Sequence, residues 1–219
     1  LLRYVAGVNL NTRTAFGVQS DIGMRGSTFS QVLILVDNQR INDPLTAHFN
    51  NNIPIPLSEV HHIEIVRGAA AASFGADAVG GVIHIKTKAF VNLFDNDEKF
   101  GLNGNIAVGE YNLTQTDIGV FEQKAKFGYS GAIKTVSSVG EQYRNPNYPA
   151  TGDSLYSNFF DLKTYAVAAT YRHNNIKLYS RFGGDLREFA AKYFYTASNF
   201  DESIERVNSY WTQLAAQYD

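Results

Sequence analysis

The sequence predicts two regions of different construction: an α+β domain over residues 1–88, and antiparallel strands of a transmembrane β-barrel over residues 99–219. A linker over residues 89–98 is expected between them. Three observations support this division. Short apolar runs punctuated by Gly and Pro dominate the first region, period-2 alternation of apolar and polar residues dominates the second, and most of the 13 Tyr and 15 Phe lie in the C-terminal half.

Composition excludes several classes of protein. The net charge is −2 and the pI is near 6.2, so no basic field favours nucleic-acid binding. The absence of cysteine excludes disulfides and thiol chemistry. The longest apolar run has five residues, Val32–Val36, whereas a membrane helix needs about 20. The chain opens without Met and without a signal-peptide pattern, so we expect that residue 1 is not the natural start.

The first half of the α+β region is expected to begin with a short helix that Gly7 terminates. "SDIGMRG" predicts a short strand interrupted by its glycines. Val32–Val36 is continuously apolar, which is typical of a strand buried on both faces. Asp37 and Asn38 then predict a turn, and "QRIND" a brief second strand.

The second half of this region begins with a polar, Pro-punctuated loop, "PLTAHFNNNIPIP". Ser58 is expected to cap a single helical turn, and "HIEIV" predicts a strand. "GAAAASFG" predicts a short helix with Phe74 packed inward, and "GGVIHIKTK" a closing strand. About four strands and a few short helices make this an α+β domain.

The second region alternates apolar and polar residues over about six strands of about ten residues each. In the first of them, one face collects the large apolar side chains, namely Phe100, Leu102, Ile106 and Val108. "GEYN" and "RHNN" predict tight turns, while "GEQYRNPNYPATGDSLYSNFF" predicts a long loop. A soluble antiparallel sheet with one wet face is the alternative. Strand length, tyrosine enrichment and the long loop favour the barrel.

A barrel of six strands would leave backbone groups unpaired at its edges, which lipid does not tolerate. We therefore expect the chain to be a fragment of a longer protein.

Four blocks in the first region carry a family resemblance. "DIGMRG", "VLILVDNQRIND", "IPIPLSEVHHIEIVRG" and "SFGADAVGGVIHIKTK" occur in the order and spacing that resemble the plug domain of TonB-dependent outer-membrane receptors, with most likeness to the cobalamin-receptor-like branch. The sequence departs from the usual residues at four positions, Asn38, Ala69, Phe74 and His84. The resemblance implies a plug inside a barrel of about 22 strands. This chain would then contain the plug and the first few strands of that barrel.

The resemblance also implies a function. It is TonB-dependent active transport of a scarce nutrient, such as a siderophore or cobalamin, across the outer membrane, with the plug gating the barrel lumen. The implied partners are TonB, through a TonB box outside this fragment, a small-molecule ligand and outer-membrane lipid, but no nucleic acid. An outer-membrane ligand-binding or scaffold module without transport would have the same plug. A soluble enzyme is a third possibility. The plug motifs do not decide which ligand is transported.

Three charged residues are candidates for electrostatic contacts between plug and barrel. Arg25 and Arg67 each precede a glycine, and the resemblance implies that they pair with acidic side chains on the inner barrel wall. A guanidinium group can bind a carboxylate through two hydrogen bonds, which suits a partly dry lumen. Glu64 is the third candidate, and it could instead serve, like Asp37, as a partner within the plug.

The Asn-rich loop is the candidate ligand-binding segment. The resemblance implies that it reaches the outward-facing apex of the plug. Its candidate ligand-binding residues offer donors, acceptors and one aromatic face: Asn42, Asp43, Thr46, His48 and Phe49. Each of them could equally be an ordinary residue of a surface loop.

No metal, cofactor or catalytic site is predicted. His61 and His62 would point to opposite faces of a regular strand, so they could not bind one ion together. The glycines of "GADAVGG" have a spacing similar to a phosphate-binding loop, but the lysine and the following Ser or Thr are absent. No catalytic motif is found elsewhere, so the protein is not expected to be an enzyme.

Overall fold

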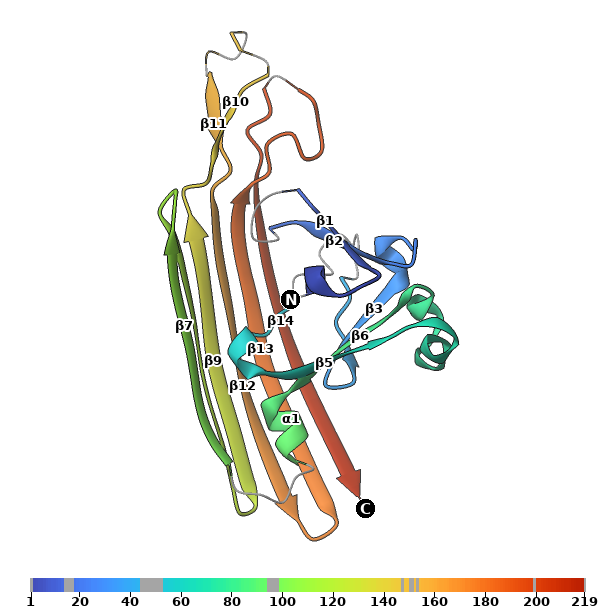
Figure 1. The fold of residues 1–219 in the computed structure, drawn as a ribbon. Helices are drawn as coiled ribbons and strands as arrows, with labels where there is room; N and C mark the ends of the chain where they lie inside the picture. The colour runs from blue at the N-terminus through green and yellow to red at the C-terminus, as the bar shows by residue number, and fades with distance from the viewer. Residues whose placement is uncertain are drawn as a thin grey trace.

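The computed structural model describes residues 2–13, 18–43, 53–93, 99–146, 148–149, 152, 154–198 and 200–218. A tall, curved sheet forms a wall, and a smaller N-terminal domain lies against the inner face of that wall (Figure 1). Among the described residues, no helix is long and apolar enough to cross a membrane.

The N-terminal domain is built on a four-stranded sheet of order β4-β3-β6-β5. Strand β3 (Val32–Val36) pairs in parallel with β6 (Gly81–Thr87) and antiparallel with β4 (Gln39–Arg40). Strand β5 (Val60–Val66) pairs antiparallel with β6. All five residues of β3 are buried, which confirms that this apolar run is covered on both faces.

A separate hairpin, β1 (Val8–Thr12) and β2 (Ser20–Met24), packs beside this sheet. The described residues of the domain therefore contain six strands instead of about four. The predicted short helix is a 3-10 turn, η1 (Leu2–Tyr4), and Gly7 follows it with a φ of 78°. The sequence reading missed β1 because the alternate residues of that strand are only half-buried.

The other helical segments in the described part of the domain are 3-10 turns: η3 (Phe29–Gln31), η4 (Leu57–Glu59), η5 (Gly68–Phe74) and η6 (Ala76–Ala78). The expectation that Phe74 packs inward is wrong, because the ring is 40% exposed. Only the small side chain of Ala71 is buried in η5, and it packs against Leu33, Leu35 and Val82. The Phe74 ring lies at the margin of the sheet, where it meets the ring of His84 in β6 edge to face at 6.4 Å.

The main core lies on the opposite face of the domain sheet, toward the hairpin and the wall. It contains apolar residues of β2, β3 and β6, namely Ile22, Met24, Val32, Ile34, Val36, Ile83 and Ile85. Ala166 of the wall is part of the same cluster, and Trp211 packs against it. The domain and the wall are thus joined by one apolar core.

The wall is a six-stranded antiparallel sheet of order β14-β13-β12-β9-β8-β7. The strands are β7 (Lys99–Gly109), β8 (Leu113–Lys124), β9 (Phe127–Ser138), β12 (Phe160–His173), β13 (Ile176–Ala190) and β14 (Ile204–Tyr218). The predicted outer face of β7 is confirmed, since its four large apolar side chains are 70–80% exposed. The inner face carries the side chains that meet the domain.

The two ends of the wall differ. At one end, β8 connects to β9 and β12 to β13 through tight turns at residues 125–126 and 174–175. At the other end lie the long loops over residues 139–159 and 191–203, the first of which contains the hairpin of β10 (Gln142–Arg144) and β11 (Leu155–Ser157). "GEYN" and "RHNN" are both tight, but they lie at opposite ends (Figure 1).

The segment predicted as a linker contains a short helix, α1 (Lys88–Leu93). Ala89, Phe90 and Leu93 are buried in a cluster with Ala168 and Tyr179 of the wall. Helix α1 therefore attaches the end of β6 to the inner face of the sheet.

Candidate functional site

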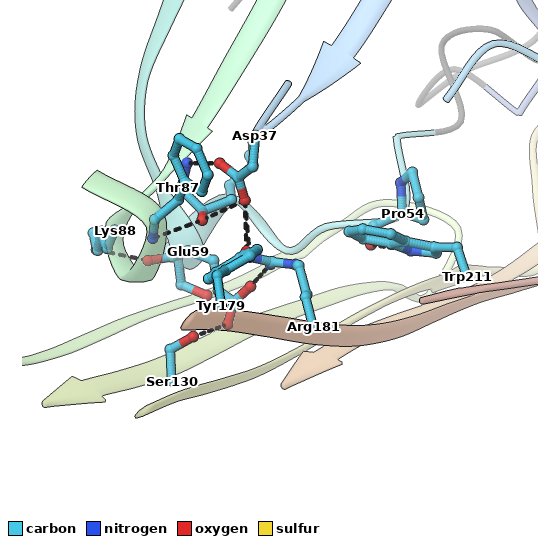
Figure 2. A network of polar contacts seen from close by, with 12 residues as sticks. Asp37, Pro54, Glu59, Thr87, Lys88, Ser130, Tyr179, Arg181 and Trp211 are labelled. Atoms are coloured by element: carbon cyan, nitrogen blue, oxygen red, sulfur yellow. Dashed lines mark hydrogen bonds and ion pairs between the residues drawn. The ribbon is translucent and has the colours of Figure 1, made fainter. Parts of the chain in front are cut away.

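The contact between the N-terminal domain and the wall contains a buried charged network around Arg181 of β13 (Figure 2). The Arg181 side chain is fully buried and forms an ion pair with Glu59 of η4. Its Nη1 atom lies 3.6 Å from Asp37 Oδ2 and donates a hydrogen bond of 3.2 Å to the Tyr179 hydroxyl oxygen. Asp37, Glu59, Tyr179 and Arg181 are called the Arg181 network below.

Asp37 connects three strands. It follows β3, and its Oδ1 accepts a hydrogen bond of 2.8 Å from the backbone N–H of Thr87 in β6. Its Oδ2 accepts hydrogen bonds from Thr87 Oγ1 and from the hydroxyl of Tyr179 in β13, each 2.7 Å long. Asp37 holds a left-handed backbone conformation with a φ of 48°, which turns its carboxylate toward the wall. A carboxylate excluded from water needs such partners.

Turn η4 is bound to the wall by several further contacts. Ser130 of β9 donates a hydrogen bond of 2.9 Å to Glu59 Oε1. Asp117 of β8 accepts hydrogen bonds from the backbone N–H groups of Leu57 and Ser58, at 2.9 and 3.2 Å. The carboxylate of Asp117 therefore satisfies the first N–H groups of a turn in another domain, as a capping residue does.

Contacts on β14 extend the interface. Gln213 Nε2 donates a hydrogen bond of 2.7 Å to the backbone oxygen of Asp37, and Trp211 Nε1 donates one of 3.3 Å to the oxygen of Pro54. The Arg181 guanidinium lies 5.5 Å from the centre of the Trp211 ring. The interface between plug and wall thus combines charged hydrogen bonds with a cation–π contact.

Arg25 and Arg67 lie away from this interface. A Cβ atom added to Gly68 would lie 3.2 Å from Arg25 Nη1, so Arg25 lies beside the segment that follows Arg67. Figure 1 shows η5, which starts at Gly68, on the side of the domain away from the six strands. Neither arginine forms an ion pair with the described residues of the wall. Their pairing with acidic groups of a barrel stays a prediction.

Glu64 lies on β5 with partners inside its own domain. Its Oε1 is 3.0 Å from His62 Nε2, and its Oε2 is 3.6 Å from His84 Nδ1. The hydrogen bond from His62 lowers the pKa of Glu64, and burial lowers the pKa of His84. At neutral pH we therefore expect a carboxylate beside the neutral imidazole of His84.

The expectation that His61 and His62 point to opposite faces is wrong. A β-bulge between Val60 and His62 interrupts the regular alternation of β5. The two Nδ1 atoms lie 2.7 Å apart, and the rings meet edge to face. Even so, no group of three or more potential ligands that could hold a metal is found among the described residues.

The candidate ligand-binding loop is only partly within the described residues, since Thr46, His48 and Phe49 lie outside them. Asn42 Oδ1 accepts a hydrogen bond from Ile34 N, and Asn42 Nδ2 donates one to Val32 O, both 2.8 Å long. The Asn42 amide thus binds the edge of β3 as a neighbouring strand would. Ligand contact stays a prediction for the loop, including Asp43.

Sequence reasoning missed an aromatic cluster at the long-loop end of the wall. Tyr143 of β10 stacks on Tyr156 of β11 with ring centres 5.8 Å apart, and Tyr156 meets Tyr193 edge to face at 5.6 Å. Lys192 Nζ lies 5.5 Å from the centres of the Tyr156 and Tyr193 rings. Tyr143 and Tyr156 were visible in the predicted long loop, but their meeting with Tyr193, which follows β13, depends on the tertiary structure. Arg181 and Glu59 were missed for the same reason.

Known proteins with similar sequences include a plug-domain family and two vitamin B12 transporters. Residues 1–82 match the family described as TonB-dependent Receptor Plug Domain. A vitamin B12 transporter, BtuB, of Vibrio vulnificus is 34% identical over 151 residues, which cover 65% of this chain and 24% of the relative. BtuB of Vibrio cholerae strain O395 is 42% identical over 89 residues, which cover 41% of this chain and 14% of the relative. The chain thus spans a quarter or less of the length of these curated relatives.

Solved structures share the fold at low sequence identity. The FrpB iron transporter of Neisseria meningitidis, in an apoprotein form, superposes with a TM-score of 0.68 at 18% identity, covering 98% of this chain and 33% of that one. The copper transporter OprC superposes with a TM-score of 0.66 at 12% identity, covering 87% of this chain and 28% of that one. The chain therefore contains a TonB-dependent receptor plug domain over residues 1–82, and the fold of the plug and of the antiparallel wall strands that follow it is shared with these solved transporters.

Proposed function

We propose that the protein of which this chain forms part carries out TonB-dependent uptake of a scarce nutrient across the outer membrane of a Gram-negative-type bacterium, with the plug gating the lumen. One observation carries the mechanism: the plug is bound to the wall through side chains, and among the described residues no strand pairs with both. Side-chain contacts such as the Arg181 network can break and reform without unravelling either sheet.

The asymmetry of the wall supports an orientation. Barrels of this class have short turns on the periplasmic side and long loops outside. The aromatic cluster of Tyr143, Tyr156 and Tyr193 then faces the medium, where rings can bind a planar or apolar part of a ligand. The short turns face the periplasm, where TonB would pull on the plug. Outer-membrane lipid would cover the apolar outer face of the strands.

Gating requires a plug that opens locally at a lower free-energy cost than global unfolding. The Arg181 network fits a contact that holds the closed state. Its ion pairs form only while plug and wall are together, because Glu59 and Asp37 belong to the plug and Arg181 to the wall. Water entering the opened interface would hydrate these charges and reduce the cost of separating them.

An uptake assay tests the proposed function. The full-length receptor is expressed in a strain that lacks its own receptors, and cobalt-labelled cyanocobalamin is the first probe because the curated relatives are named vitamin B12 transporters. We expect accumulation that disappears when TonB is deleted, while binding to whole cells persists. A panel of ferric siderophores follows if cyanocobalamin is not bound. Binding of a probe without TonB-dependent accumulation would refute transport and favour a binding or scaffold module.

Substituting Arg67→Ala in the full-length receptor is expected to loosen the plug and raise passive leakage several-fold. The reason is the proposed loss of charged contacts between this arginine and the part of the barrel that the chain does not include. Leakage is measured as sensitivity of cells to a large antibiotic that an intact outer membrane excludes. The matched control is Arg40→Ala, which removes only an exposed ion pair with Asp77. Equal sensitivity of the two variants would count against the contact.

A further inference from the structure

Two adjacent imidazoles, those of His61 and His62, meet on one side of β5. The β-bulge takes His61 out of the register with β6, because Val60 pairs with Thr87 and His62 pairs with the next residue along, Lys86. An extra residue of this kind redirects a side chain that regular alternation would place on the opposite face. The two Nδ1 atoms are consequently 2.7 Å apart, and the ring planes meet at 77°. Both residues are exposed, so water and small ions can reach them.

The partner of His62 decides which of its ring nitrogens carries a proton. An ionised carboxylate only accepts hydrogen bonds, so His62 Nε2, which lies 3.0 Å from Glu64 Oε1, is the donor. A neutral imidazole with its proton on Nε2 has its lone pair on Nδ1. The lone pair of His62 therefore faces His61 Nδ1.

Glu64 is held from its other side by His84. The backbone N–H of Asn38 can only donate, so His84 Nε2 accepts its hydrogen bond of 3.2 Å. Neutral His84 then carries its proton on Nδ1, which lies 3.6 Å from Glu64 Oε2. His84 is 5% exposed, so packing restricts its ring. A buried histidine thus positions the carboxylate that orients His62.

This arrangement is the one that supports metal-binding histidines. In metal sites, the second ring nitrogen of a ligating histidine usually donates to a carboxylate, which fixes the tautomer and makes the ligating nitrogen more basic. Glu64 and His62 have this geometry, with Nδ1 as the nitrogen left to bind a metal. A shift of the His61 proton from Nδ1 to Nε2 makes its Nδ1 lone pair available as well. Two lone pairs then converge on one point beside β5.

The separation of the two nitrogens favours a metal whose ligands lie at right angles. Imidazole nitrogens bind zinc at about 2.0–2.1 Å, and at such bond lengths two of them are about 2.9 Å apart at a right angle and about 3.3–3.4 Å apart in a tetrahedral site. The observed 2.7 Å is closer to the first value. Tetragonal sites with nitrogen and oxygen ligands are typical of Cu²⁺ and Ni²⁺, and Cu²⁺ binds such ligands most tightly in the divalent first-row series.

We propose that His61 and His62 bind a Cu²⁺ ion through their Nδ1 atoms, with Glu64 as the supporting carboxylate of His62. Among the described residues no third potential ligand joins them in a group that could hold a metal, so water completes the coordination. Lys88 and Lys99 lie near His61, and their positive charges weaken the binding of a cation. The site is therefore expected to bind copper reversibly. This inference does not rest on the proposed transport function.

Copper binding is measured on the purified full-length receptor, produced without a polyhistidine tag and freed of metals with EDTA before dialysis. Copper sulfate is titrated by calorimetry, and the bound ion is observed by electron paramagnetic resonance, in which ligating nitrogens split the Cu²⁺ signal. We expect the splitting of two imidazole nitrogens, and affinity at least tenfold lower in His61→Ala and in His62→Ala. Glu64→Gln keeps both nitrogens but loses the charge behind His62, and it should weaken binding about tenfold to a hundredfold. Zn²⁺ should bind more weakly than Cu²⁺.

The matched control is His173→Ala, the same change at a histidine of β12 that lies beside Tyr171. This variant should bind Cu²⁺ with the affinity and the spectrum of the unsubstituted receptor. A copper signal that is the same in His61→Ala, His62→Ala and His173→Ala would belong to other residues and would overturn the site. Absence of copper binding to the unsubstituted receptor would overturn it as well, because the two imidazoles would then share only a hydrogen bond. Hydrogen exchange of β5 in each variant checks that the strand remains folded.

Discussion

Substituting Arg181→Met in the full-length receptor is expected to destabilise the closed plug more than any other single change in the interface. Methionine preserves much of the apolar stem but leaves the carboxylates of Glu59 and Asp37 buried without their cation. Removing one partner of a buried ion pair costs about 3–5 kcal/mol. The variant should therefore leak, and the N–H groups of η4 should exchange with solvent orders of magnitude faster.

Two related substitutions show how much of the effect comes from the charges of the Arg181 network and how much from the shape of its side chains. Arg181→Lys keeps the positive charge but loses the planar guanidinium, so its effect should be intermediate. Glu59→Gln should cost less than Arg181→Met, because the amide oxygen can still accept the hydrogen bond from Ser130. The matched control is Arg206→Met, which removes an exposed ion pair with Glu188 whose expected worth is about 0–1 kcal/mol.

Hydrogen exchange of the plug, followed by mass spectrometry of the full-length receptor in detergent, is the appropriate measurement. It reports local opening, whereas the barrel would dominate a global unfolding signal. Exchange in Arg181→Met no faster than in Arg206→Met would show that the Arg181 network does not hold the plug.

Substituting Gly81→Ala is the second change with a large expected effect. Gly81 has a φ of 149°, a conformation that L-residues rarely adopt. An added Cβ would lie 2.6 Å from Met24 Cε and 2.8 Å from the backbone oxygen of Val66. The Met24 side chain can move, but the Val66 oxygen belongs to the neighbouring strand β5 and cannot. Backbone strain and overpacking together should lower the free energy of unfolding of the plug by about 2–5 kcal/mol.

Gly75→Ala separates these two contributions. Gly75 has a φ of 106°, but no atom lies within 4 Å of its added Cβ. This variant therefore reports the backbone strain alone, about 1–3 kcal/mol. Hydrogen exchange of β5 and β6 should accelerate more in Gly81→Ala than in Gly75→Ala. Equal rates would mean that close packing at Gly81 does not contribute.

These two glycines lie in the segment from Val66 to Lys88, which the sequence analysis assigned to a short helix and a closing strand. Both elements are present as η5 and β6, because alanine-rich and β-branched stretches have local preferences that survive in the fold. The side chain of Phe74 was misplaced because its exposure depends on how η5 packs on the sheet. That packing is a tertiary property.

The sequence by itself determined where most of the strands lie and which face of β7 is apolar. The five apolar residues of β3 are buried, and the outer residues of β7 are exposed, as their spacing predicts. Hydrophobic periodicity suffices for this, because burial is set by positions two residues apart in a strand. The order of four plug motifs was likewise readable and led to the family.

Only the tertiary structure decided which polar groups meet. Arg181 lies far along the chain from Glu59 and Asp37, and its partners depend on how the plug packs against β13. The bulge in β5 brings His61 and His62 together against the expectation for a regular strand. Long-range charge pairing and local irregularity have no sequence period, because both are set by the packing of whole elements.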